Sequence, residues 1–138
     1  QLATDLYYVA VRHRNHLGAM TLGQVSLSGS TALIDFTSPA LATYGNEACK
    51  TVGGKMVLWT GNARLDNSLK YTGTNNDRDR ILVRVGNTTP NNIVLGYYPE
   101  DLTLDGSVKY TGTQNDRDPI LVNVGSTVPT NTASEQVP

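Results

Sequence analysis

Residues 62–92 read NARLDNSLKYTGTNNDRDRILVRVGNTTPNN, and residues 101–131 read DLTLDGSVKYTGTQNDRDPILVNVGSTVPTN. The offset between them is 39 residues throughout (101 − 62), and 20 of the 31 aligned positions are identical. Such a constant offset indicates that one supersecondary unit has been duplicated. We therefore divide the chain into a region at 1–60 and a duplicated region at 61–138, which ends in an extended C-terminal tail.

The second copy opens with a pattern that is typical of a calcium loop. Asp101, Thr103 and Asp105 place oxygen side chains at loop positions 1, 3 and 5, and Gly106 follows at position 6. An EF-hand loop begins in this way, because alternate side chains face one hard cation and the glycine permits a sharp turn. The loop therefore predicts a bound calcium ion.

The closing ligand of this loop has to come from further along the chain. An EF-hand closes with a bidentate glutamate at position 12, whereas Gly112 stands there and offers no side-chain oxygen. The carboxylates of the NDRD tetrapeptide are the next available, and we expect Asp116 to close the site. Asp118 is a second candidate ligand, or else a helix cap, and Ser107 is expected to contribute its main-chain carbonyl.

The loop of the first copy is poorer in carboxylates. Asn62 and Arg64 stand at loop positions 1 and 3, and Asn67 replaces the glycine. Because fewer charges lower the affinity for a divalent cation, we expect this site to be weaker, rebuilt with other ligands, or empty. Its candidate ligands are Asn62, Asp66, Ser68, Asp77 and Asp79.

Each copy continues from NDRD into a short apolar run, ILVRV at 81–85 and ILVNV at 120–124. Five residues fit either a helix or a strand by periodicity alone. We predict a short helix in both copies, because NDRD supplies capping residues and a glycine follows each run. In the second copy Pro119 would be the first helical residue, after an Asp118 cap.

Region 1–60 has the composition of short strands separated by turn residues. Such spacing favours an antiparallel sandwich. We therefore predict a mainly β protein, with a small antiparallel β-sandwich-like half followed by two calcium loop–short helix repeats. The strands are expected at Leu6–Val11, Thr21–Ser28, Ala32–Phe36 and Lys55–Thr60.

The composition excludes several other classes of function. Eleven Lys and Arg residues against twelve Asp and Glu give no basic field for nucleic acid. No apolar stretch is long enough for us to expect membrane insertion. The only cysteine, Cys49, excludes an internal disulfide and a cysteine-based zinc site, and leaves either a buried apolar role or an intermolecular crosslink.

The sequence also argues against catalysis. His13 and His16 are the only histidines, and on a strand their spacing would place them on opposite faces. They are more simply read as polar side chains in a hairpin. No Ser-His-Asp order, phosphate-binding loop or dinucleotide fingerprint is present, and the paired carboxylates are used by the loops. We predict that the protein is not an enzyme.

Three stretches carry a resemblance to a known group of proteins: RHRNHLG at 12–18, MVLWTGNA at 56–63 and the doubled KYTGTxNDRD. Together they resemble the C-terminal region of large secreted or cell-surface bacterial proteins with dockerin-like calcium-binding repeats. In that pattern a loop begins Asp-x-Asn-x-Asp-Gly, which Asp101 and Asp105 match and the first copy does not. The resemblance implies an extracellular or cell-surface, calcium-stabilised structural or attachment module.

These observations lead to one expected function and one alternative. We expect an extracellular calcium-stabilised structural protein that self-assembles into a filament or sheath-like polymer, with itself as partner. A terminal segment, either 130–138 or the residues before Leu6, would pair with an open sheet edge of a neighbouring chain. The alternative is a monomeric calcium-dependent adhesion, docking or carbohydrate-binding module, for which a surface protein or a polysaccharide would be the partner.

Overall fold

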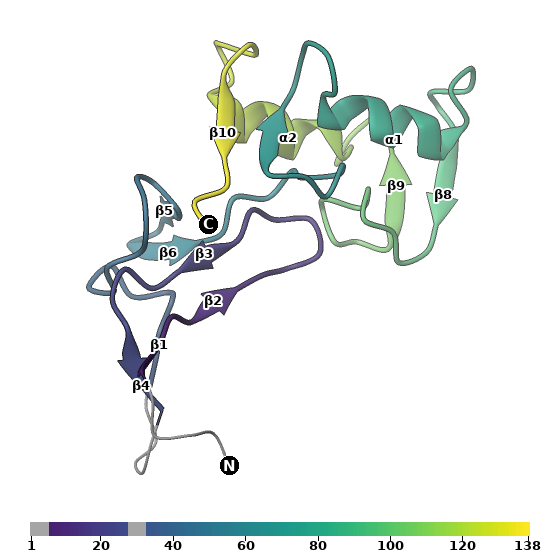
Figure 1. The fold of residues 1–138 in the computed structure, drawn as a ribbon. Helices are drawn as coiled ribbons and strands as arrows, with labels where there is room; N and C mark the ends of the chain where they lie inside the picture. The colour runs from purple at the N-terminus through teal and green to yellow at the C-terminus, as the bar shows by residue number, and fades with distance from the viewer. Residues whose placement is uncertain (1–5, 28–32) are drawn as a thin grey trace. The chain divides into compact units, whose positions relative to one another are not determined.

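The computed structural model describes residues 6–27 and 33–138, and it divides the chain into two compact units (Figure 1). The first is here called the N-terminal unit, and its described part comprises residues 6–13, 18–27, 33–59 and 135–138. The second, here called the repeat unit, comprises residues 14–17 and 60–134. The unit boundary at Trp59 and Thr60 lies beside the predicted one, but each unit also takes a short segment from the other's part of the sequence.

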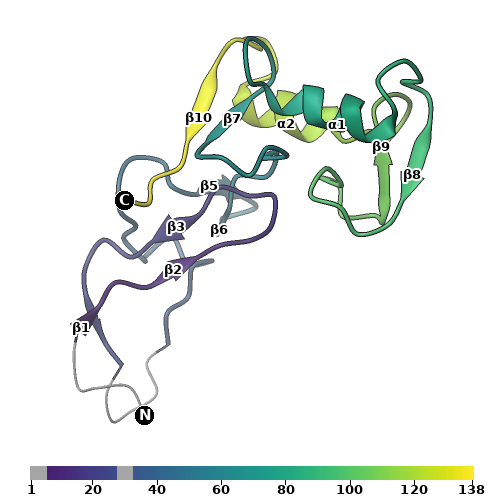
Figure 2. The same ribbon diagram turned by 45° about the vertical axis from the view of Figure 1, so that its right-hand side comes forward.

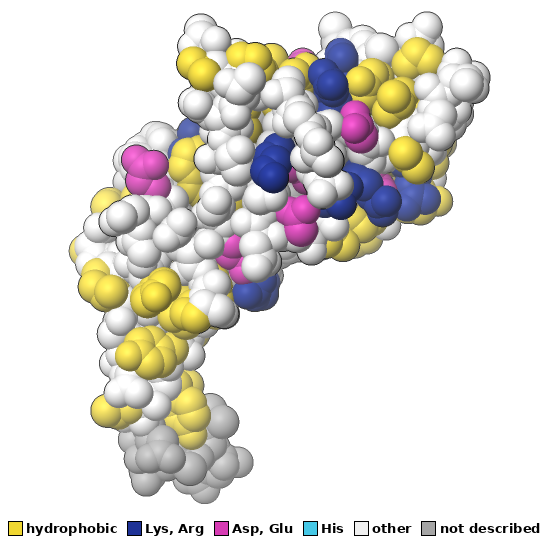
Figure 3. Space-filling view, turned by 45° about the horizontal axis from the view of Figure 1, so that its top comes forward, with side chains coloured by type: hydrophobic (Ala, Val, Ile, Leu, Met, Phe, Trp, Pro, Cys, Tyr) yellow, Lys and Arg dark blue, Asp and Glu magenta, His cyan; other side chains and the backbone are white. Residues whose placement is uncertain are grey.

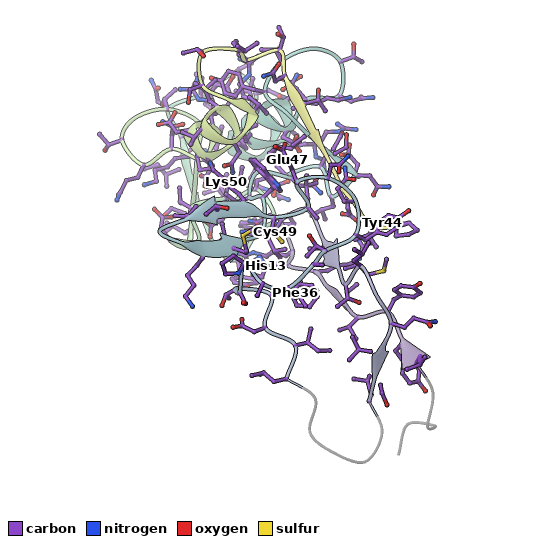
Figure 4. The ribbon with its side chains drawn as sticks, turned by 90° about the vertical axis from the view of Figure 1, so that its left-hand side faces the viewer. His13, Phe36, Tyr44, Glu47, Cys49 and Lys50 are labelled. Carbon is purple, nitrogen blue, oxygen red and sulfur yellow. The ribbon has the colours of Figure 1, made fainter. Side chains whose placement is uncertain are left out.

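The N-terminal unit contains three antiparallel pairs of short strands. They are β1 (Leu6–Tyr7) with β4 (Val25–Ser26), β2 (Ala10–Val11) with β3 (Ala19–Met20), and β5 (Lys50–Val52) with β6 (Lys55–Val57). The core behind these pairs is small and consists of Ala19, Ala48 and Cys49. Partly buried side chains pack against it, namely those of Val11, Phe36, Met56 and Leu58. Figure 4 shows Cys49 and Phe36 within this unit.

The prediction of a mainly β, sandwich-like fold is wrong. Every sheet in the described part of the chain has only two strands, and each strand has two or three residues. The described part of the strand expected at 32–36, residues 33–36, is not a strand. The physical reason lies in the core, because two alanines and a cysteine cannot cover the inner faces of two full sheets. A two-stranded hairpin is marginal alone and depends on packing against its surroundings.

Cys49 is buried in this core, with 7% of its surface exposed. Burial raises the pKa of its thiol, so little thiolate forms at neutral pH. Of the two roles open to the residue, a buried apolar one agrees with its position, since an intermolecular crosslink needs an accessible sulfur.

The repeat unit shows the duplication in its order of elements. The first copy forms β7 (Ser68–Lys70), α1 (Asp77–Val85) and β8 (Ile93–Leu95), and the second forms β9 (Ser107–Lys109), α2 (Arg117–Val124) and β10 (Thr132–Ser134). The strands of the second copy follow their counterparts by 39 residues, which is the offset of the sequence repeat. Figure 2 shows both helices with their strand pairs.

The strands of the two copies pair with each other and not within a copy. β8 pairs with β9, where Val94 lies opposite Val108, and β10 pairs with β7, where Ala133 lies opposite Leu69. Each helix contacts strands of both copies: α1 packs against β9 as well as β7 and β8, and α2 packs against β7 as well as β10. Each copy therefore completes the other, and a single copy would leave its apolar face unburied.

The core of the repeat unit comes equally from both copies. Ile81 and Val85 on α1, like Ile120 and Val124 on α2, are four residues apart and so lie on one face of their helix. They pack with the central residues of the two strands. The buried set is Leu69, Ile81, Val85, Val108, Ile120 and Val124.

The helix ends show which residue of NDRD caps. Asn76 accepts the Asp79 N–H at the start of α1, and Asn115 accepts the N–H groups of Arg117 and Asp118 at the start of α2. The asparagine is thus the capping residue, and Asp118 is not. Pro119 is the third residue of α2, not the first as predicted. Both helices end at a left-handed glycine, Gly86 with φ 110° and Gly125 with φ 109°, as expected.

The C-terminal segment pairs inside the chain. Thr132–Ser134 forms β10 on β7, so this part of the predicted pairing segment has a partner inside the chain. The alternative segment before Leu6 lies outside the described residues. Glu135 then forms an ion pair of 2.6 Å with Arg12 and accepts the Gly18 N–H within the N-terminal unit. Separately, none of the helices in the described part of the chain is long and apolar enough to cross a bilayer.

Candidate metal-binding loops

The loop of the second copy closes around the carboxylate of Asp101, which is 1% exposed. Its Oδ1 accepts the Asp105 N–H at 3.2 Å, and its Oδ2 accepts the Gly106 N–H at 3.0 Å. Gly106 has φ +82°, a left-handed conformation that a glycine adopts without strain. The loop backbone therefore orients this carboxylate before any ligand binds.

Asp116 reaches the same loop from the start of α2 and is fully buried. Its Oδ1 accepts the N–H groups of Leu102 at 2.7 Å and Thr103 at 3.0 Å. Its Oδ2 accepts the Lys109 N–H at 2.8 Å. One carboxylate thus ties the loop, β9 and α2 together, at the point where the sequence predicted the closing ligand.

Three hard oxygens converge here. The hydroxyl of Thr103 lies 3.5 Å from Asp101 Oδ1 and 3.3 Å from Asp116 Oδ1. Burial raises the pKa of Asp116 and the charge of Asp101 adds to the rise, while N–H bonds from Lys109, Thr103 and Leu102 partly offset it. A cation placed beside these oxygens would relieve that unfavourable charge. These three side chains are oxygen donors of the kind that calcium takes, but they are fewer than the six to eight ligands that calcium requires.

The other predicted ligands of this copy are directed elsewhere. Asp105 accepts the Ser107 N–H and forms an ion pair of 3.2 Å with Lys109. Asp118 is bound by the Asn115 amide, and Ser107 lies in β9 opposite Leu95. Across the described residues, no three His, Cys, Asp or Glu side chains form a group that could hold a metal ion. Calcium would thus have to draw Asp105 away from Lys109 or use main-chain and water oxygens.

In the first copy, hydrogen bonds and an ion pair join Asn62, Arg64 and Ser68 to Asp66. The Asn62 side chain bonds both the N–H and the carbonyl of Asp66. Arg64 Nε lies 3.2 Å from Asp66 Oδ2, and Ser68 donates its N–H and hydroxyl to Asp66 Oδ1. The arginine at loop position 3 therefore places a positive charge beside Asp66, whereas Thr103 at the same position of the second copy is uncharged.

Asp77 takes the place that Asp116 has in the second copy. It is fully buried and accepts the N–H groups of Arg64 at 3.0 Å and Lys70 at 2.8 Å. Burial raises the pKa of Asp77 to about 6, although these two bonds act in the opposite direction. Asp79 does not join it, because the Asn76 amide binds the Asp79 carboxylate at 2.8 Å.

The loops depend on a residue that the sequence reasoning missed. Asn15 is fully buried, and its carbonyl accepts the N–H groups of Gly61 and Asn62, both at 3.1 Å. Its side-chain amide donates to the carbonyls of Pro99 at 3.2 Å and Asp101 at 2.7 Å. One asparagine thus joins the starts of both loops, and the signal that could have identified it is the RHRNHLG motif.

The neighbours of Asn15 support the same contact. His16 Nδ1 lies 2.9 Å from Asn15 Oδ1, which helps to orient the amide. Arg14 Nη2 lies 3.5 Å from Asp101 Oδ2, and the Arg14 guanidinium stacks on Tyr97 at 3.3 Å from the ring centroid. The motif therefore positions the second loop and places a fixed positive charge beside its first carboxylate.

Comparison with protein-family models, with curated proteins and with solved structures finds no match to this chain.

Proposed function

We propose that this chain is a non-catalytic, calcium-stabilised structural module of an extracellular or cell-surface assembly, and that it associates with copies of itself. The observation that carries the calcium part is the convergence of Asp101, Thr103 and Asp116 in one closed loop. The resemblance of the repeats to dockerin-like sequences supports the extracellular location.

Calcium would stabilise the folded conformation of the second loop. When bound, the ion would offset the charge of the buried Asp116 carboxylate and share Asp101 with Arg14. Asp116 is bonded to the loop and to β9, and Asn15 connects Asp101 to the start of the first loop. Stabilisation at this point would therefore extend to both copies, which fits a role in holding a shape.

Direct binding tests this function. Isothermal titration of the chelator-treated chain with calcium should give a single site, and Asp101→Asn should remove it. Magnesium serves as the control, because its octahedral geometry with short bonds suits a flexible oxygen loop poorly. The absence of calcium binding to the folded wild-type chain at millimolar calcium would overturn the calcium part.

Self-association is tested separately by sedimentation over a concentration series in calcium. Because Thr132–Ser134 already pairs with β7 in its own chain, we assign the contact between molecules to another surface. A chain that remains monomeric at the highest concentrations would favour the attachment-module alternative.

A further inference from the structure

A groove of about 430 Å³ lies beside the second loop, within the repeat unit. The charged residues of its lining, Asp105 and Asp118, are both acidic. Asn115 and Asn123 contribute amides, and Pro119 and Val122 on α2 contribute apolar surface, with Val122 55% exposed. An acidic groove with an apolar strip suits a cationic side chain that has an aliphatic stem.

Of the two acids in this groove, Asp118 is the one whose carboxylate can still accept an ion pair. Asp105 already forms an ion pair with Lys109. Asp118 Oδ2 accepts one bond from Asn115, and Asp118 forms no ion pair with any residue between 6–27 or 33–138. The adjacent Arg117 stacks on Tyr110 at 4.6 Å and does not neutralise it. A planar guanidinium could bind this exposed carboxylate.

The first copy carries more positive charge on the equivalent surface. Its counterparts of Thr103, Pro119 and Asn123, 39 residues earlier, are Arg64, Arg80 and Arg84, whereas the two acidic positions are kept as Asp66 and Asp79. In this copy a guanidinium binds the counterpart of Asp105, because Arg64 Nε lies 3.2 Å from Asp66 Oδ2. Asp79, the counterpart of Asp118, is bound by the Asn76 amide and forms no ion pair within the described residues. Both copies therefore leave this acid open to a cation, and the second copy has no arginine at the three neighbouring positions that would repel one.

The first copy also offers such an arginine. On α1, Arg84 binds Glu100 at 3.1 Å and Arg78 stacks on Tyr71 at 5.0 Å. The exposed Arg80 side chain forms no hydrogen bond or ion pair with the residues that the structure describes. Val83 follows one turn later and is 54% exposed. Figure 3 shows basic side chains beside hydrophobic ones on the surface of the repeat unit.

We propose that the groove between α2 and the second loop binds the Arg80 face of α1 from a second copy of this chain. The Arg80 guanidinium meets Asp118, and Val83 meets the apolar strip of Pro119 and Val122. The inference rests on the proposed self-association and assigns its contact. Because the two surfaces differ, each molecule can use both, and the contact propagates head to tail.

Charge reversal tests the contact on the full chain in calcium. Sedimentation velocity should show that Arg80→Glu and Asp118→Arg each weaken association by about tenfold or more. Asp118→Asn should weaken it too, without placing a positive charge at a helix start. Lys55→Glu makes the charge change of Arg80→Glu on an exposed position of the N-terminal unit and should leave association unchanged. Circular dichroism confirms that each variant is folded.

The decisive measurement is an equimolar mixture of Arg80→Glu and Asp118→Arg. The reversed charges then face each other, so the mixture should associate as the wild type does. If the wild type associates and the single variants associate equally well, the proposed contact is wrong while self-association stands. The same holds if the wild type associates but the mixture stays monomeric. A monomeric wild type would overturn both. If that monomer bound an arginine-containing peptide through Asp118, the groove would belong to another protein partner.

Discussion

The side-chain amide of Asn15 donates a 2.7 Å hydrogen bond to the main-chain carbonyl of Asp101, which lies 86 residues later in the chain. The same amide reaches the Pro99 carbonyl, and the Asn15 carbonyl accepts from the start of the first loop. Buried main-chain groups without a partner are costly, so these bonds hold both loops in place. The duplicated loops are therefore joined by a residue that belongs to neither copy.

Replacing Asn15 with alanine should lower the free energy of unfolding by about 2–4 kcal/mol, because the carbonyls of Pro99 and Asp101 lose a buried donor. Urea unfolding followed by circular dichroism measures the change. Asn46→Ala is the control, because Asn46 is exposed and its substitution should change stability by less than about 0.5 kcal/mol. Equal effects of the two substitutions would contradict the role of Asn15.

Asp77 should make stability depend on pH in metal-free buffer. The pKa of its carboxyl is raised from 3.8 to about 6 by burial, so the folded state holds the proton more tightly than the unfolded state. The stabilisation is complete below pH 3.8 and is lost as the pH rises through 6. A shift of this size corresponds to about 3 kcal/mol.

The Asp77 contribution is isolated by comparison with Asp77→Asn, which cannot titrate. The difference in unfolding free energy, wild type minus variant, should fall as the pH is raised from 3.8 to 6. Carboxyl NMR should place the Asp77 titration near pH 6. A difference that stays constant over this range, or that rises with pH, would show that the buried carboxyl is not protonated in the folded state.

Calcium should raise the melting temperature of the wild-type chain. A free calcium concentration about one hundred times the dissociation constant adds roughly 2.7 kcal/mol of stability, which corresponds to a shift on the order of 10 °C for a chain of this size. Asp101→Asn and Asp105→Ala should reduce that shift, since both remove a carboxylate from the second loop. Melting curves in calcium and in chelator give the measurement.

The first copy provides the matched control for calcium. Asp66→Ala is the counterpart of Asp105→Ala, and it removes a carboxylate that already binds Arg64. This variant should be less stable in calcium and in chelator alike, and should keep the calcium-dependent shift. Equal loss of the shift in both variants would mean that the first copy also holds an ion.

A fragment that contains one copy alone, residues 60–99, should not fold. Its helix has nine residues, too few to be stable in isolation, and its strands β7 and β8 have their partners in the other copy. The full chain should give a helical signal in circular dichroism from its two helices. The fragment should give no such signal. Cooperative thermal unfolding of the fragment would show that the copies are independent.

Some features of the protein follow from its sequence alone. The 39-residue duplication, the two short helices and the glycines that end them could be read directly, because the capping residues and the helical spacing of Ile81 and Val85 lie close together in the chain. A contact of Asp116 with the loop was also predicted from the sequence, because position 12 is Gly112 and Asp116 is the next carboxylate that was not expected to cap a helix.

Only the tertiary structure decided which strands pair. Runs of two or three residues, such as Val25–Ser26, do not specify how many partners they have, which is why the sandwich prediction failed. β8 pairs with β9, and β10 (Thr132–Ser134) pairs with β7, so each strand has its partner in the other copy. These pairings depend on which strand edge the fold brings close, and that edge is distant in the sequence. The bond from Asn15 to Asp101 depends in the same way on a contact across 86 residues, and the RHRNHLG motif marks Asn15 without specifying its partner.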